Sequence, residues 1–438
     1  MINKNIFTKT LSAAAVVAGL SAIQVAEAAN WLMLQGTERP GAAGRAKVWG
    51  FVQAQYQSDS SDPFVHPGTG EDLWVPPKLI GPNLESQAQF NVNRARLGVR
   101  GIGMPLDSSV NYFLLAEFGH NGITGNDNDA AVSDASITVN TDVTRIRMGL
   151  FKTPGPEEAL QAIHVFDYIN FTSVSNQLML ERFQSAGDNN PSAPYPVELE
   201  LGTAGGINNF EAPVGAFRDT GIQFFDSFKS GKWDTSYAIM IGNGNGLNFG
   251  DNDDNKDVYT YVSSELSFGG KGPRAQGLKF FAWNQSGTRT NPLDTTQEQD
   301  RKRSGVGVKY LKKPFRATFE YMSGEGMIFM GQHRPRHIFN DHEASGYYAD
   351  FGYYIPNSKW EIDLRVDSYT REENHPGSAQ DDESTFDTTT IAAQYHINKK
   401  TRVTIEHSNR TFESETVQVN NQLEGVGART AVQLTHIF

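Results

Sequence analysis

The sequence predicts an all-β chain that closes into a transmembrane antiparallel barrel of about 16 strands, with a long third external loop inserted into it. Three observations predict this fold. Segments of alternating apolar and polar residues recur to the last residue, the connections between them are alternately short and long, and the chain begins with a stretch typical of an export signal.

Residues 1–28 have the three parts of a signal peptide. Lys4 and Lys9 form a basic start, residues 11–23 are apolar, and Ala26-Glu27-Ala28 is a small-residue cleavage site. The apolar part is too short to span a bilayer, so we expect removal rather than the alternative, a retained anchor. We expect residues 29–44 to form a periplasmic segment and residues 45–438 to form the barrel.

Composition excludes several classes of protein. The chain has 438 residues, with 50 Asp and Glu against 38 Lys and Arg and a net charge of -12, which makes it a poor nucleic-acid binder. It has no Cys, which excludes disulfides, thiolate metal sites and iron–sulfur clusters. Only 38% of residues are hydrophobic, too few for a bundle of membrane helices of about 20 apolar residues each.

The strand pattern is clear at residues 358–369. Trp360, Ile362 and Leu364 alternate with charged residues, as expected for a wall between lipid and water. The same reasoning places strands near 45–57, 87–101, 108–119, 131–140, 143–153, 216–228, 232–243, 257–268, 277–287, 303–311, 314–324, 345–355, 359–371, 385–397, 400–410 and 426–438.

The connections alternate as they do in outer-membrane barrels. The longer ones are polar and fall near 58–86, 120–130, 154–215, 244–256, 288–302, 325–344, 372–384 and 411–425. Both termini lie on the short-turn side, and Phe438 closes an amphipathic strand, which resembles the sorting signal of bacterial outer-membrane proteins. We therefore expect the outer membrane of a Gram-negative cell.

The connection over residues 154–215 is unusually long. Pro156 followed by Glu157 and Glu158 favours a helix over 157–163, and a second short helix is expected over 175–183. We favour a loop folded into the barrel, where it narrows the pore, because long loops in compact folds are usually functional. The alternative is an external lid.

Two motifs connect the chain to a known family. One runs Arg147-Met148-Gly149-Leu150-Phe151-Lys152-Thr153-Pro154, followed by Glu157-Glu158 and Leu180-Glu181-Arg182; the other is Asn93-Arg94-Ala95-Arg96-Leu97-Gly98 with Gly101. With these motifs the chain resembles the phosphate-selective porins of the O and P type, in organisation over about 45–438. The resemblance implies a sixteen-stranded trimeric porin with an inward-folded third loop. Gly155-Pro156 stands where the family often has Phe-Gly, so the loop is expected to enter differently.

Alternation predicts a basic strip on the inner face. Its members are Arg94, Arg96, Arg100, Arg145 and Arg147, extended by Lys152 and Arg182. Arginine suits phosphate or carboxylate because its planar guanidinium donates paired hydrogen bonds. An equally weighted alternative is that these cations neutralise acids of the long connection, namely Glu157, Glu158 and Glu181.

The same reasoning predicts an acidic wall opposite the strip. Its members are Glu320, Asp350, Glu361, Asp363, Asp367 and Glu406. Facing walls of opposite charge produce a transverse field that orients polar solutes. We therefore predict passive diffusion of small hydrophilic solutes or ions, with a preference for anions such as phosphate.

Two other functions are compatible with a barrel. A barrel could form a sheath around an electron-transfer cytochrome, or it could be an outer-membrane enzyme, although no catalytic constellation is present. No cofactor or metal is expected, since the acidic run at 251–257 lacks the glycine of a calcium loop and has Val262 at the twelfth position. Expected partners are membrane lipid, lipopolysaccharide, two further copies of the chain, and small hydrophilic or anionic solutes.

Overall fold

The computed structural model describes a set of segments that covers the barrel wall and parts of its connections. These segments are 30–34, 46–62, 64–65, 72–73, 87–102, 109–121, 123–124, 130–181, 217–247, 250–251, 253–270, 274–291, 294–329, 338–339, 342–372, 382–415, 420 and 424–438. The predicted signal peptide at 1–28 lies outside them.

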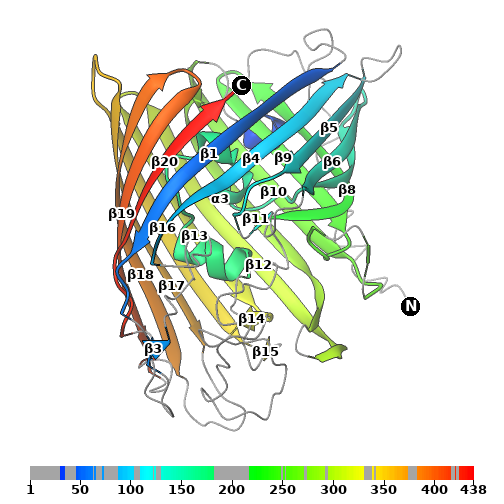
Figure 1. Ribbon diagram of the computed structural model, residues 1–438. Coiled ribbons are helices and arrows are strands. Elements are labelled where there is room, and N and C mark those ends of the chain that lie inside the picture. Colours follow the sequence, from blue (N-terminus) through cyan, green and yellow to red (C-terminus); the bar gives the residue numbers. More distant parts are fainter. Residues whose placement is uncertain are drawn as a thin grey trace.

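The chain forms a closed barrel of sixteen antiparallel strands (Figure 1). The wall strands are β1 (Lys47–Asp59), β4 (Ala88–Ile102), β5 (Val110–Glu117), β6 (Ala131–Asn140), β7 (Arg145–Lys152), β8 (Arg218–Ser230), β9 (Trp233–Gly242), β10 (Asp257–Gly269), β11 (Gln276–Asn291), β12 (Asp294–Lys312), β13 (Phe315–Glu325), β16 (Glu343–Tyr354), β17 (Trp360–Glu372), β18 (Glu383–Asn398), β19 (Thr401–Ser414) and β20 (Arg429–Ile437). Neighbours in the wall follow chain order, and β1 closes the barrel by pairing with β20 and β4. The predicted barrel and its strand number are confirmed.

The alternating pattern has the predicted physical basis. Along β17, Ile362 and Leu364 are exposed on the outer face, while Glu361 and Asp363 are buried inside. A register shift at Gln53 inserts one extra residue into β4, so that Asn93 and Arg94 are both buried. Within the described part of the chain, no helix is long and apolar enough to cross a membrane.

One predicted boundary is wrong. Residues 288–302 were expected to form an external loop, but β11 and β12 stay paired as far as Asn291 and Asp294. The hairpin therefore extends past the apolar part of the wall, where its outward positions carry polar residues because no lipid faces them. Two small sheets, β2 (Phe64–Val65) with β3 (Asp72–Leu73) and β14 (Ile328–Phe329) with β15 (Ile338–Phe339), lie in long connections at the end opposite the carboxyl terminus (Figure 1).

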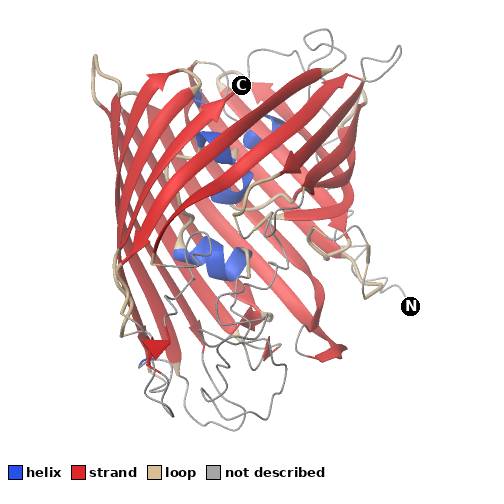
Figure 2. Cartoon of the chain, in the orientation of Figure 1, coloured by secondary structure: helices blue, strands red, loops and turns tan. Residues whose placement is uncertain are grey.

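Short helical segments lie inside the wall rather than outside it (Figure 2). They are α2 (Trp31–Leu34), α3 (Glu157–Leu160), a 3-10 turn at Ile163–Val165 and a π-helical turn at Ser175–Met179. The two helical regions predicted in the long connection therefore exist, each shorter than expected. Residues 30–34, within the segment expected to be periplasmic, contact the inner face through Asn30, which donates a hydrogen bond to Ser236.

Candidate functional site

The described first half of the long connection, residues 153–181, lies within the barrel. Almost all of its side chains are buried, and its apolar ones pack in one cluster with inward-facing residues of the wall. Leu160, Val174 and Leu178 belong to this cluster and are at most 1% exposed. The molecule's apolar core thus occupies the lumen, where it constricts the barrel.

The predicted acidic residues hold this connection in place. The Glu406 carboxylate accepts hydrogen bonds from the Ile169 backbone at 2.6 Å and from the Asn170 amide side chain at 2.8 Å. Asp367 accepts from the Ser173 backbone at 2.8 Å. Glu320 accepts from the Glu157 backbone at 3.1 Å. These acceptors come from β13, β17 and β19, which lie close together on the side of the barrel opposite β7, so they fix the connection against the wall opposite the strand that it follows.

The acidic residues are interleaved with arginines that are not members of the predicted acidic wall or basic strip. The Arg316 guanidinium lies 2.6 Å from Asp350, 2.5 Å from Asp363 and 3.3 Å from Asp167 of the connection. Glu361 lies 3.4 Å from the same guanidinium. Arg365 and Arg402 face inward as well, at positions that share the parity of the predicted acids. The acidic wall is therefore largely neutralised, and the predicted transverse field is correspondingly weaker.

The acids of the connection pair with cations outside the predicted basic strip. Glu157 contacts Lys279 and lies 2.9 Å from Lys309. Burial alone would raise the pKa of Glu157, but these two ammonium groups outweigh it and lower the pKa to about 2.

The other two acids also contact wall cations that lie outside the predicted basic strip. The Glu158 carboxylate accepts from the Thr172 hydroxyl at 2.7 Å and lies 3.4 Å from Arg365. Glu181 contacts Arg301 and lies 3.3 Å from Arg303. The alternative that the strip arginines neutralise these acids is wrong for the described residues.

The strip itself lies on the inner face of β4 and β7. Arg94, Arg96 and Arg147 are buried, and Arg100 and Arg145 are partly exposed. Arg182 lies outside the described residues. The arginines of the strip contact side chains from several strands. Arg94 donates a hydrogen bond to Gln53 at 3.1 Å, and Arg96 donates one to Glu117 at 2.6 Å. Arg145 lies 3.2 Å from Asp226, and Arg147 donates a hydrogen bond to Thr138 at 3.2 Å.

Lys152 links the strip to the connection. Its ammonium group donates to the Ala159 and Gln161 carbonyls at 2.6 and 2.9 Å. Lys152 lines one cavity of 390 Å³ together with Arg96, Arg100 and Arg147. Arg218 of β8 lines the same cavity, although the alternating pattern did not predict a role for it. The structure therefore brings four of the predicted basic residues together.

A second cavity, of 770 Å³, adjoins the first at the short-turn end, since His164, Lys400 and Ile437 line both. Its charged lining is entirely basic and consists of Arg274, Lys313, Lys359, Lys399, Lys400 and Arg402. We call this space the basic vestibule. Arg274 lies 2.6 Å from Asp167 of the connection, whereas no Asp or Glu is among the described residues that line the space with the four lysines.

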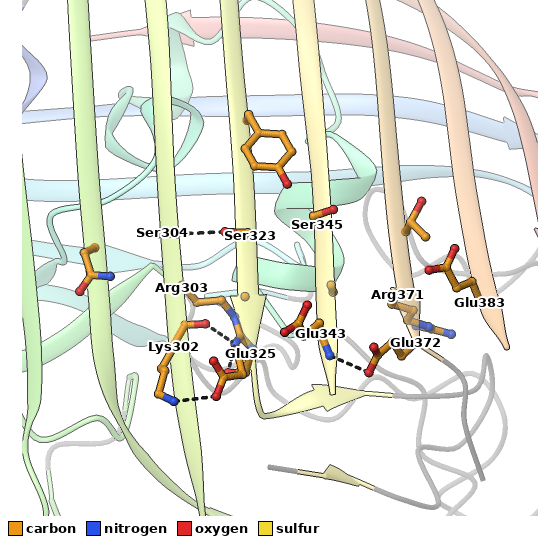
Figure 3. A pocket seen from close by; sticks show the side chains of 15 residues that line it. Lys302, Arg303, Ser304, Ser323, Glu325, Glu343, Ser345, Arg371, Glu372 and Glu383 are labelled. Atoms are coloured by element: carbon orange, nitrogen blue, oxygen red, sulfur yellow. Dashed lines mark hydrogen bonds and ion pairs between the residues drawn. The ribbon is translucent and has the colours of Figure 1, made fainter. Parts of the chain in front are cut away.

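A third depression, of 360 Å³, lies on the outer side of the wall near the long connections (Figure 3). Here Ser304 and Ser323 hydrogen-bond across β12 and β13 at 3.0 Å, and Lys302 lies 2.6 Å from Glu325. Tyr321, on the same face, is 43% exposed. This surface belongs to the exterior and takes no part in the lumen.

Comparison with known proteins agrees with this architecture. The anion-selective porin from Comamonas acidovorans aligns over 90% of this chain and 99% of its own, with a TM-score of 0.53 and 13% identity. OmpF of Salmonella typhi, solved in complex with daunomycin, aligns over 90% and 97%, with a TM-score of 0.50 and 11% identity. These likenesses show the shared fold. No curated protein sequence matches the chain.

The sequence itself matches a family model over most of its length. The family is described as phosphate-selective porin O and P, and the matched residues are 81–436. This family and the barrel fold are those of an outer-membrane channel rather than of an enzyme. The chain therefore belongs to the phosphate-selective porin O and P family.

Proposed function

We propose that this outer-membrane porin passes small hydrophilic solutes and ions by passive diffusion and prefers anions such as phosphate. The observation that carries the preference is the basic vestibule, which is lined by six Lys and Arg side chains and no Asp or Glu. A solute on this side meets a positive potential, which raises the local concentration of anions and lowers that of cations.

The basic strip continues this environment deeper into the lumen. We propose pore-lining roles for its arginines and for Lys152, because Arg96, Arg100, Arg147 and Lys152 line one cavity on the inner face. Arginine presents paired donors to phosphate or carboxylate oxygens and stays charged. Glu157, Glu158 and Glu181 are proposed to shape the constriction rather than to attract cations, since each is held by a cation of the wall.

The setting of the channel is also a proposal. We propose that residues 1–28 are cleaved as a signal peptide, that three copies assemble as the family resemblance implies, and that lipid and lipopolysaccharide surround the trimer. Glu325, Glu343 and Glu372 lie on the outer face beside the long connections (Figure 3). A sheath around a cytochrome is disfavoured because residues 153–181 already occupy the lumen.

Reversal potentials in asymmetric KCl across planar bilayers test the proposal. The native channel is expected to give an anion-selective potential. The triple variant Lys313→Gln, Lys359→Gln, Lys399→Gln should reduce the anion-to-cation permeability ratio by about two- to fivefold, because exposed charges act at roughly 1 kcal/mol or less each in water. Lys302→Gln, on the outer face, is the matched control. Absence of current, or a ratio that the triple variant leaves unchanged, would reject the proposal.

A further inference from the structure

The 390 Å³ cavity beside the basic strip has an aromatic wall as well as a charged one. Trp49 and Phe51 of β1 and Phe113 of β5 line it, together with His164 of the connection. Phe51 belongs to the apolar cluster of the lumen, and Trp49 packs against that cluster. The cavity volume falls in the range of about 300–1,000 Å³ typical of small-molecule sites.

The rings form a connected apolar surface. The Trp49 ring centroid lies 5.8 Å from that of Phe113 and 5.8 Å from that of His164, and His164 lies 5.0 Å from Phe51. Burial lowers the pKa of His164 to about 3, so its imidazole is neutral at pH 7 and joins this surface without adding charge. The alternate residues Val48 and Val52 point outward, so the inward placement follows from the strand pattern.

Cations border the rings closely. The Arg96 guanidinium lies 5.8 Å from the Phe51 ring centroid, and the Arg100 guanidinium lies 5.8 Å from that of Phe113. Seven Lys and Arg side chains line the cavity, and Asp134 is the single Asp or Glu among the described residues that line it. Arg96 pairs with Glu117 and Arg218 with Asp134, and the lining remains positive when both pairs are counted.

These two surfaces together select a chemical class. A hydrated inorganic anion would gain from the cations but nothing from the rings, and a neutral aromatic compound would gain only from the rings. A small carboxylate that carries an aromatic ring would use both, with its ring against Trp49 and Phe113 and its carboxylate toward the guanidinium groups. We propose that this cavity is a binding site for small aromatic carboxylates on their way through the channel. The inference rests on the proposed anion-conducting function.

The test measures block of single-channel current in KCl by added benzoate, cyclohexanecarboxylate, acetate and benzamide. Benzoate is expected to half-block at a concentration about tenfold or more below that of acetate, because stacking on an aromatic wall adds roughly one tenfold step. Cyclohexanecarboxylate should require several times more than benzoate, and neutral benzamide should block least. Calorimetry on the detergent-solubilised protein should give the same order. Equal potency of benzoate and acetate, or of benzoate and benzamide, would overturn the inference.

Variants locate the site. Trp49→Leu and Phe113→Leu keep apolar bulk but remove a ring, and each should weaken benzoate block about five- to tenfold. Phe386→Leu, an inward-facing ring that packs on Tyr369 and Phe412 away from this cavity, is the matched control and should leave block unchanged. Equal loss in the control and the cavity variants would refute the location. The reversal potential without benzoate is measured first, so a channel that prefers anions but ignores the ring contradicts only this inference.

Discussion

Replacing Glu406 by glutamine is expected to loosen the inserted connection. One carboxylate oxygen accepts hydrogen bonds from the Ile169 backbone at 2.6 Å and the Asn170 backbone at 3.5 Å, and the other accepts from the Asn170 side chain at 2.8 Å. Glutamine retains a single acceptor oxygen and turns an amide donor toward one of these donors. The variant therefore loses at least one charge-assisted hydrogen bond without a change in side-chain length.

A hydrogen bond to a charged group contributes about 1.5–3 kcal/mol. Since 1.4 kcal/mol corresponds to a tenfold change in an equilibrium constant, the ratio of released to docked connection should rise roughly ten- to one-hundredfold. Glu320 and Asp367 still hold other parts of the connection, so release is local and the barrel itself should stay folded.

Single-channel recording detects the released state as brief steps to higher conductance. Glu406→Gln should show these steps far more often than the native channel at the same voltage. Ser408→Ala is the matched control, because Ser408 lies on the same strand and face but pairs with Thr390 at 2.9 Å. If the recordings of Glu406→Gln and the native channel were indistinguishable, the anchoring role derived from the geometry would be wrong.

Three further predictions concern the lumen and the assembly. Burial raises the pKa of Glu158 to about 7, from an ordinary value of 4.5, so its contribution to docking is present below pH 4.5 and lost as the pH rises through 7. High-conductance steps should therefore become more frequent between pH 5 and 7.5, and Glu158→Gln should reduce that rise. The triple variant Trp31→Ala, Leu32→Ala, Met33→Ala removes three buried apolar side chains of α2, and each truncation costs about 2–5 kcal/mol. The α2 segment should therefore leave the lumen, and the single-channel conductance should increase. An unchanged conductance would contradict this prediction. Native mass measurement in detergent should give three chains per particle, and a monomer would contradict the proposed assembly.

The strands were predictable because their pattern has a direct physical cause. A wall between lipid and water needs apolar side chains at every second position, and Ile362, Leu364 and Val366 show that periodicity plainly. Where the wall extends beyond the membrane, no lipid faces it, and the outward positions no longer need apolar side chains. The outer parts of β11 and β12 were therefore interpreted as a loop, although their backbone pairing continues to Asn291. The predicted strands are thus those in contact with lipid.

The pairing of charges was not predictable in the same way. Alternation tells which side chains face inward, but closure of the barrel determines which of them meet. Glu157 meets Lys279, 122 positions along the chain, and Glu406 meets Asn170, 236 positions away. No local pattern encodes such separations. Arg316 and Arg365 share the parity of the predicted acids, so the sequence did contain the signal that the wall is mixed.

The acidic residues inside the barrel are engaged in contacts with the protein itself, which is how a chain of negative net charge can be proposed to favour anions. Inside the barrel, Glu320, Asp367 and Glu406 accept hydrogen bonds from the connection, and Asp363 is matched by Arg316, so these acids add little to the field that a solute meets. The vestibule lysines have no carboxylate of this kind beside them in the described structure. Net charge therefore says little about selectivity, because acids engaged in holding the constriction do not act on the solute. In the proposed function, selectivity follows from the Lys and Arg side chains that line the vestibule at the short-turn end.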